Sequence, residues 1–326
     1  MIPTDCGGRV LVTGASGFVG QALCRTLLQT GFDVTATSRR LDVLPGLDLN
    51  TVRVGDMDGD TDWRKALIGC SSVIHLAARV HVMDESARDS MDTYRAINTH
   101  GTLTLALQAA QAGVKRFVYL STVKVNGEET VLGQPFKADD SARPQDPYAV
   151  SKHEAETGLS KLAGQTGMDV VIIRPPLVYG PGVKANFHSM MRWLHRGMPL
   201  PFGAIHNKRS LVALDNLVDL LVTCIHHPSA ANQTFLVSDH DDLSTTELLQ
   251  RMGMALGRPA RLISVPQEWL AWGAGLLGRK DLARRLIGSL QVDIGKTRDL
   301  LGWSPKVTVE EALRKTAQHF ISHGGR

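Results

Sequence analysis

Gly14-Ala15-Ser16-Gly17-Phe18-Val19-Gly20 is the stretch that decides the fold of this 326-residue chain. It follows the apolar run 10–12 and leads into residues 21–28, where apolar side chains repeat at helical spacing. Glycines between a strand and a helix let backbone N–H groups approach a pyrophosphate at the helix N-terminus. The stretch therefore predicts a dinucleotide-binding turn, with these cofactor-contacting residues: Gly14, Ser16, Gly17, Phe18, Val19 and Gly20.

Strand-like and helix-like segments alternate over the first half of the chain. The expected strands are 9–13, 33–38, 52–54, 72–75, 116–121 and 170–174, and the expected helices include 63–67, 93–112 and 148–166. This alternation predicts an α/β fold, a Rossmann-type doubly wound parallel sheet with a smaller C-terminal substrate-binding lobe. Because Pro- and Gly-rich stretches begin after Pro175, we expect an NAD(P)-binding domain at 1–175. Residues 176–326 would mainly form the lobe, with some segments returning to the sheet.

Composition excludes several classes of protein. The chain is 43% hydrophobic with a formal charge of +4, and its basic residues are scattered among acids, so we expect no nucleic-acid partner. The four cysteines form no C-x-x-C pair and no zinc-like spacing, which predicts no metal site and a reduced, cytoplasmic location. The apolar stretch 269–277 covers less than half of the roughly 20 residues that a membrane span needs. It predicts a buried helix and no membrane insertion.

Tyr148 and Lys152 form a Tyr-x-x-x-Lys pair. Asp146 and Pro147 directly upstream suit a helix N-cap and the first helical position, so the pair would lie one turn apart on one face. An ammonium beside a phenol favours the tyrosinate and lowers its pKa, which would let Tyr148 exchange a proton with a substrate oxygen. The alternative is a surface i,i+4 pair without chemistry.

Ser121 and Thr122 follow the apolar strand 117–120, at the sheet edge where open parallel sheets bind ligands. The Thr122 hydroxyl could hold a substrate oxygen, with Ser121 beside it. A hydroxyl that only caps the strand end is the alternative.

The end of the second strand bears on the choice of cofactor. NAD sites usually place an acid there for the ribose, but this chain has Ser38, followed by Arg39 and Arg40. Guanidinium groups suit a 2′-phosphate, so the sequence favours NADP(H), with NAD(H) as the alternative. Asp56, with Met57 beside it, is placed to meet the adenine amino group.

Further motifs carry a resemblance to a known family. They are His75-Leu76-Ala77-Ala78, Asn98-Thr99-His100-Gly101-Thr102, the run from Arg174 to Gly182, and Leu301-Gly302-Trp303-Ser304-Pro305. With the glycine turn and Tyr148/Lys152, the chain resembles the extended short-chain dehydrogenase/reductase family, of the NAD-dependent epimerase/dehydratase type, over nearly its whole length. The resemblance implies these further cofactor contacts: Leu76, Ala77, Ala78, Asn98 and Pro175, with Tyr148 and Lys152.

The resemblance also implies an enzyme that oxidises or reduces a ring carbon, commonly C4, of a nucleotide-activated sugar. Thr122, Tyr148 and Lys152 would be catalytic, and the family commonly forms homodimers, here through 93–112 and 148–166. The implied or candidate substrate contacts are Arg79, His81, Ser121, Thr122, Asn186, Arg209 at the diphosphate, and a second diphosphate arginine, Arg285 or Arg284.

One departure narrows the chemistry. Dehydratases of the family carry Asp-Glu after the catalytic Thr, whereas this chain has Val123-Lys124 and so lacks their acid and base. A second departure is Asn126, where many members have Tyr. The overall look resembles reductases that act on UDP-4-keto-6-deoxy-N-acetylhexosamines in surface-polysaccharide (O-antigen) biosynthesis, which is our leading expectation. The alternatives are a UDP-hexose or UDP-N-acetylhexosamine 4-epimerase with retained NAD, and a non-catalytic nucleotide-binding module.

Overall fold

The computed structural model describes residues 8–39, 46–47, 49–80, 87–276, 284 and 286–324. Its centre is a seven-stranded sheet in the order β3-β2-β1-β4-β5-β6-β9, with every neighbouring pair parallel. The strands are β1 (Arg9–Thr13), β2 (Asp33–Ser38), β3 (Asn50–Arg53), β4 (Cys70–His75), β5 (Arg116–Leu120), β6 (Asp169–Arg174) and β9 (Thr234–Leu236). The Rossmann-type parallel sheet is thereby confirmed.

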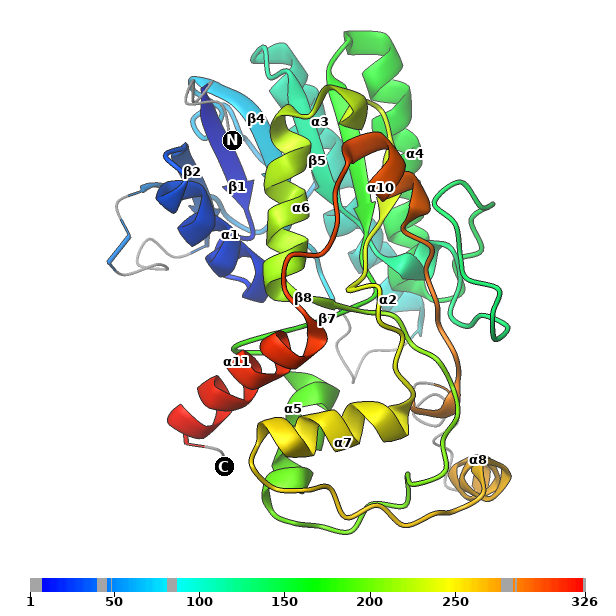
Figure 1. The fold of residues 1–326 in the computed structure, drawn as a ribbon. Helices are drawn as coiled ribbons and strands as arrows, with labels where there is room; N and C mark the ends of the chain where they lie inside the picture. Colours follow the sequence, from blue (N-terminus) through cyan, green and yellow to red (C-terminus); the bar gives the residue numbers. More distant parts are fainter. Residues whose placement is uncertain are drawn as a thin grey trace.

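Helices cover both faces of the sheet (Figure 1). One face carries α1 (Phe18–Gln29) packed against α6 (Leu214–His226), and the other carries α3 (Thr102–Gln111) against α4 (Pro147–Thr166). The chain reaches α3 through α2 (Ala87–Tyr94) and a π-helical turn, η1 (Arg95–Gly101). Each face buries its own hydrophobic cluster, because strand residues alternate between two covered faces.

A smaller lobe lies below the carboxyl ends of the strands in Figure 1. It contains α5 (Ala185–His195), α7 (Thr245–Ala255), α8 (Gln267–Leu276) and α11 (Val309–Ser322). The short pair β7 (Leu177–Tyr179) and β8 (Leu211–Ala213) joins it to the sheet, and a third hydrophobic cluster forms its interior. Residues beyond Pro175 also supply β9 and α6, while the division into two domains at 175 stays a prediction.

The short connecting elements are η2 (Val123–Val125), η3 (Pro228–Ala230) and α10 (Gly295–Leu301). The structure confirms the predicted strands to within a few residues and the helix 148–166. Two predictions were wrong. Residues 64–69 form turns rather than a helix. Trp269 and Trp272 on α8 are 71% and 70% exposed, so their side chains are not buried as the sequence suggested.

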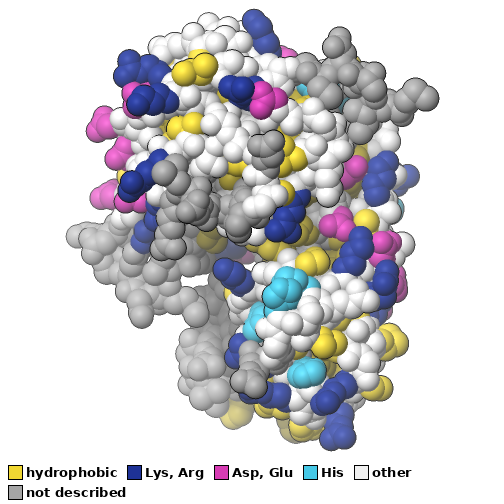
Figure 2. All heavy atoms as spheres, turned by 90° about the vertical axis from the view of Figure 1, so that its left-hand side faces the viewer, with side chains coloured by type: hydrophobic (Ala, Val, Ile, Leu, Met, Phe, Trp, Pro, Cys, Tyr) yellow, Lys and Arg dark blue, Asp and Glu magenta, His cyan; other side chains and the backbone are white. Residues whose placement is uncertain are grey.

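The described residues contain no helix that is long and apolar enough to span a membrane. Within the same ranges, no group of His, Cys, Asp or Glu side chains is arranged to hold a metal ion. On the face shown in Figure 2, Lys and Arg side chains lie spread among Asp and Glu instead of forming one basic patch. This distribution matches the scattered charges of the sequence.

Candidate functional site

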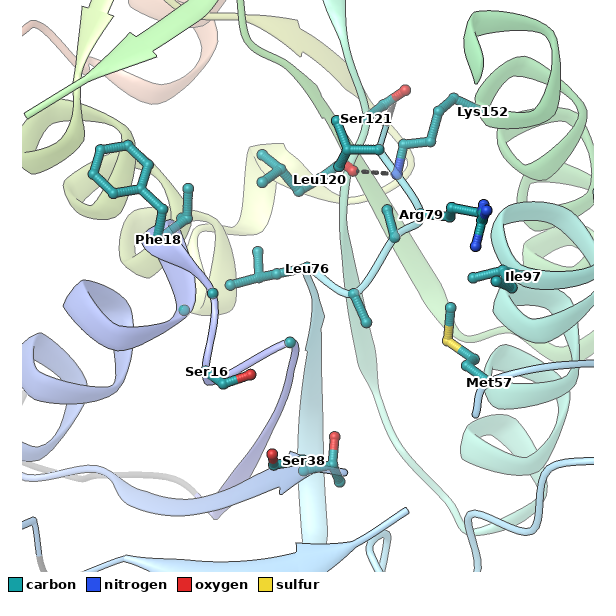
Figure 3. A pocket seen from close by; sticks show the side chains of 18 of the residues that line it. Ser16, Phe18, Ser38, Met57, Leu76, Arg79, Ile97, Leu120, Ser121 and Lys152 are labelled. Atoms are coloured by element: carbon teal, nitrogen blue, oxygen red, sulfur yellow. Dashed lines mark hydrogen bonds between the residues drawn. The ribbon is translucent and has the colours of Figure 1, made fainter. Parts of the chain in front are cut away.

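A cavity of about 690 Å³ opens at the carboxyl ends of the central strands. Figure 3 shows it from the glycine turn at Ser16 and Phe18 to Ser121 and Lys152, with Ser38 at the opposite end from Lys152. The predicted residues that line it are Gly14, Ser16, Gly17, Phe18, Val19, Gly20, Ser38, Arg39, Asp56, Met57, Leu76, Ala77, Ala78, Arg79, Ser121, Thr122, Tyr148, Lys152 and Pro175. Segments far apart in the sequence thus meet at the sheet edge where open α/β sheets bind ligands.

The glycine turn is shaped for an anion. Gly14 has φ +67°, and the Gly17 N–H donates to the Gly14 carbonyl at 2.9 Å, which folds the turn back on itself. A Cβ on Gly20 would lie 2.2 Å from that same carbonyl oxygen. The N-terminus of α1 has no side-chain cap and no acid in its first turn. Its backbone N–H groups and helix dipole therefore suit a pyrophosphate.

At the other end of the cavity, Ser38 ends β2 and Arg39 follows it. The Arg39 guanidinium lies 3.4 Å from the Asp56 carboxylate, and both side chains are highly exposed. The Asp56 carboxylate, which we expected at the adenine amino group, contacts this arginine in the structure. Arg39 remains at the cavity wall, where its charge can reach a ligand.

The helix α4 positions Tyr148 and Lys152. Asp146 caps it by accepting the Ala149 N–H at 2.6 Å, and Pro147 occupies the first helical position, as the sequence predicted. The Lys152 ammonium donates to the Leu120 carbonyl at 2.7 Å, the dashed line of Figure 3, and lies 4.1 Å from the centre of the Tyr119 ring. This lysine is buried rather than part of a surface pair.

Burial dominates the acidity of both groups. It raises the pKa of the Tyr148 phenol, with smaller contributions from Asp146 and Tyr94. Burial also lowers the pKa of Lys152 to about 7, against the opposing effect of the Glu156 carboxylate. Our expectation that Lys152 lowers the Tyr148 pKa is thus wrong, because desolvation penalises the charged forms of both groups.

Ser121 and Thr122 lie where β5 ends, and both line the cavity. The Thr122 hydroxyl accepts the Lys124 N–H at 3.3 Å as the cap of η2. Ser121 is buried and donates its hydroxyl proton to the Glu156 carboxylate at 2.5 Å. The Lys124 ammonium forms an ion pair with Asp146, so the residue that replaces a dehydratase acid contacts the cap of α4.

Three predicted residues lie outside the wall of this cavity. Asn98 is buried in the π-helical turn and fixes the loop after β4, since its side chain accepts the Arg79 N–H at 2.8 Å and donates to the Ser151 hydroxyl at 3.0 Å. Asn186 is exposed on α5, and Arg209 lies in the lobe, where it donates to the Gly288 carbonyl at 2.9 Å.

Three further predicted residues, Arg40, His81 and Arg285, fall outside the described residues. The alternative to Arg285, Arg284, forms ion pairs with Glu128 at 2.9 Å and Glu129 at 3.4 Å.

Sequence reasoning missed part of the wall. The additional lining residues are Thr37, Val54, Gly55, Trp63, Val80, Ile97, Leu120, Pro176 and Val178. Most of them directly precede or follow residues that we had named, at the ends of strands. A rule that takes two residues on each side of every strand end would have found most of them, but not Trp63, Val80 or Ile97.

Comparison with known proteins gives consistent findings. The model of the NAD dependent epimerase/dehydratase family matches residues 10–238. A UDP-glucose 4-epimerase of Vibrio cholerae is 48% identical over 320 residues, covering 97% of each chain. A 3-beta-hydroxysteroid dehydrogenase of Mycolicibacterium neoaurum is 29% identical and covers 96% of this chain and 91% of its own. The solved structure of MoeE5 in complex with UDP-glucose and NAD superposes with a TM-score of 0.76 at 27% identity, covering 97% and 99% of the two chains.

Proposed function

Because the chain belongs to the NAD-dependent epimerase/dehydratase family, we propose that it is a 4-epimerase of a UDP-hexose or UDP-N-acetylhexosamine that retains NAD. The observation that carries this proposal is the 48% identity to a UDP-glucose 4-epimerase over 97% of both chains. It favours the epimerase over the 4-keto-sugar reductase that the motifs alone led us to expect. The two reactions use the same residues, so the motifs could not separate them.

The residues present fit NAD. The uncapped N-terminus of α1 and the close approach of Gly20 to Gly14 leave backbone N–H groups for the pyrophosphate. Ser38 and Arg39 lie at the adenosine end, and the loop Leu76–Arg79 lines the path toward Lys152. Arg39 also offers a cation for a 2′-phosphate, so NADP(H) is the second candidate cofactor.

When bound, NAD supplies a hydride acceptor and donor for C4 of the sugar. Tyr148 would accept the proton of the C4 hydroxyl as that carbon is oxidised and return it when the carbon is reduced. Thr122 would donate a hydrogen bond to the same oxygen, and the Lys152 ammonium would stabilise the tyrosinate. Turning the keto sugar between the two hydride transfers would invert the configuration.

We extend the proposal to the substrate and the assembly. Arg209 in the lobe would bind the diphosphate, since a guanidinium suits phosphate oxygens. Arg79, Ser121 and Asn186, together with His81 and Arg285, stay candidates for sugar-nucleotide contacts. A homodimer and a cytoplasmic location complete the proposal, and light scattering on the purified protein tests the dimer.

The deciding experiment incubates the purified protein with UDP-glucose and UDP-N-acetylglucosamine and separates the UDP-sugars by anion-exchange chromatography. The expected result is formation of the C4 epimer without added cofactor, with NAD released on denaturation. Consumption of NADPH equal to an added UDP-4-keto sugar, with no epimer formed, would instead establish the reductase. NAD reduction by a 3β-hydroxysteroid, with no UDP-sugar turned over, would overturn both.

A further inference from the structure

A buried ion pair lies behind the reactive end of the cavity. Arg174, the last residue of β6, donates from Nε to Oε1 of Glu156 at 3.0 Å and from Nη2 to Oε2 at 2.6 Å. The two residues are 7% and 4% exposed. Such a two-pronged pair fixes the orientation of the carboxylate as well as its charge. The desolvation of both groups opposes its contribution to stability, so its presence calls for another benefit.

The carboxylate holds the end of β5. Its Oε1 accepts the Ser121 hydroxyl proton at 2.5 Å, and the Ser121 N–H donates to the Ile173 carbonyl at 2.7 Å. Ser121 directly precedes Thr122, so both its backbone and its side chain are fixed next to the hydroxyl that would hold the sugar oxygen.

Arg174 extends this support to the other side of Thr122. Its Nη1 donates to the Asn126 side-chain carbonyl at 3.0 Å, and the Asn126 side chain donates to the Lys137 carbonyl at 2.9 Å. The short segment from Ser121 to Asn126 is thus held at both ends by one buried ion pair. Asn126, at a position where many members of the family have Tyr, takes part in this support.

Glu156 also lies one helical turn after Lys152 on α4. The two side chains hold adjacent residues of β5, since Lys152 binds the Leu120 carbonyl and Glu156 binds the Ser121 hydroxyl. The negative charge of Glu156 opposes the effect of burial on the Lys152 pKa.

Other groups face this pair of charges. Around Lys152 they are Tyr119 on β5 and His75 on β4, and Tyr148 lies one helical turn before Lys152 on α4. Burial, with the charge of Lys152, lowers the pKa of His75 to about 3, so His75 is neutral and adds no counter-charge. Around Glu156 they are Arg174, His153 at 3.9 Å and the buried Tyr119. Among these groups, Glu156 is the one that can place a negative charge near Lys152 at neutral pH.

We propose that Glu156 is a positioning residue of this site, which fixes Thr122 through Ser121 and holds a negative charge one helical turn from Lys152 that favours the ammonium form of the lysine. The role of Glu156 in turnover rests on the 4-epimerase function proposed above. Its effect on the protonation of Lys152 does not depend on that function and is measured without substrate.

The test follows the titration of Lys152 by NMR in protein labelled with carbon-13 at Cε of lysine, with Lys152→Met to assign the resonance. In the wild type the midpoint is expected near pH 7. Glu156→Gln keeps the shape and removes the charge. Because the ammonium then loses its counter-charge, the midpoint should fall by about one pH unit or more. An unchanged midpoint would overturn the electrostatic part.

Two variants guard against a merely structural effect. Glu156→Gln leaves the Arg174 guanidinium buried without its partner, so the double variant Glu156→Gln/Arg174→Met is the replacement if Glu156→Gln does not fold. Because this double variant also loses the positive charge of Arg174, its Lys152 midpoint should fall by less. Asp239→Asn alters another buried carboxylate, which binds Tyr179 and Asn216 away from the cavity, and should lower stability without moving the midpoint.

The positioning part is read from turnover. Ser121→Ala keeps the charge of Glu156 and removes the hydrogen bond, so kcat should fall about tenfold with the Lys152 midpoint nearly unchanged. A rise of KM with unchanged kcat would instead show that Ser121 only contacts the substrate. An unaltered kcat would overturn the positioning of Thr122. A wild type that turns over no UDP-sugar but shows the shifted midpoint in Glu156→Gln would refute the proposed function and leave the electrostatic part standing.

Discussion

Tyr148 sits in surroundings that keep its phenol protonated at neutral pH. Burial raises its pKa, and the neighbouring Asp146 and Tyr94 raise it further. If Tyr148 is the proton acceptor and donor, Tyr148→Phe should lower kcat by two or more orders of magnitude, the usual contribution of general acid–base catalysis. Affinity for NAD, followed by calorimetry, should change little because only one hydroxyl is lost. Tyr94→Phe, on the ring packed edge-on against Tyr148, is the matched control and should retain most of the turnover.

Arg39 decides how the site treats a 2′-phosphate. Its guanidinium lies at the cavity wall, paired with Asp56. Arg39→Ala should weaken NADPH binding by about 10- to 100-fold, the scale of a hydrogen bond to a charged group, and NADH binding far less. Titration of both cofactors by fluorescence measures this, with the exposed Arg25→Ala on α1 as control. Equal losses for the two cofactors would remove the 2′-phosphate role.

Residue-level chemistry was only partly readable in the sequence. The spacing of Tyr148 and Lys152 gave their common helix face, because 3.6 residues per turn is a local property. The directions of their pKa shifts depend on burial in the folded protein, which the spacing does not reveal. The ion pair of Arg174 with Glu156 was likewise not foreseen, because it joins an arginine that we read only as part of a motif to a helix 18 residues earlier.

At the scale of elements, the junction of the glycine turn with α1 depends on the absence of a side chain at Gly20. A Cβ there would meet backbone atoms, 2.2 Å from the Gly14 oxygen and 2.7 Å from the Ala15 Cα, so neither neighbour can move without shifting the strand. Gly20→Ala should destabilise the fold and reduce NAD affinity by at least tenfold.

The control for Gly20 lies on another helix. Gly164 on α4 has nothing within 4 Å of the position of its Cβ, so Gly164→Ala should be neutral or stabilise the protein by about 0.5–1 kcal/mol. Urea unfolding and calorimetry compare the two variants. A Gly20→Ala protein that is as stable as Gly164→Ala and binds NAD normally would contradict the packing argument.

Helices and strands were predicted best where the sequence has a long apolar run or a clear capping residue at the end of the element. The strands β1, β2 and β5 and the helix α4 have apolar runs or clear caps, and their positions follow from local sequence. The segment 63–67 has apolar residues at helical spacing but forms turns, since Trp63 and Leu67 are buried by tertiary contacts that periodicity cannot reveal. The prediction that Trp269 and Trp272 are buried failed for the same reason, because apolar composition does not show whether another element covers the helix.

At the scale of the whole molecule, the C-terminal part of the chain is tied to the sheet through Asn216 on α6. Its side-chain oxygen accepts the N–H groups of Lys306 and Val307 at 2.9 Å each, and its amide donates to the Val307 carbonyl at 2.9 Å and to Asp239 at 2.7 Å. Asn216 is fully buried, so water cannot replace it as the hydrogen-bond partner of these groups. The segment leading into α11 of the lobe is therefore fastened directly to a helix that covers the sheet.

This connection predicts that sheet and lobe unfold together. Asn216→Ala leaves several buried polar groups unsatisfied and should lower the free energy of unfolding by about 3 kcal/mol or more, given about 1–3 kcal/mol for each such group. In the wild type, far-ultraviolet circular dichroism and tryptophan fluorescence should give one coincident transition, and Asn216→Ala should move that transition to lower denaturant. Asp219→Asn, which keeps an acceptor for the Trp303 indole N–H, should change stability much less. If fluorescence and dichroism instead separated into two transitions in the wild type, the lobe would be an independent unit. The boundary near Pro175 would then mark two domains that fold separately.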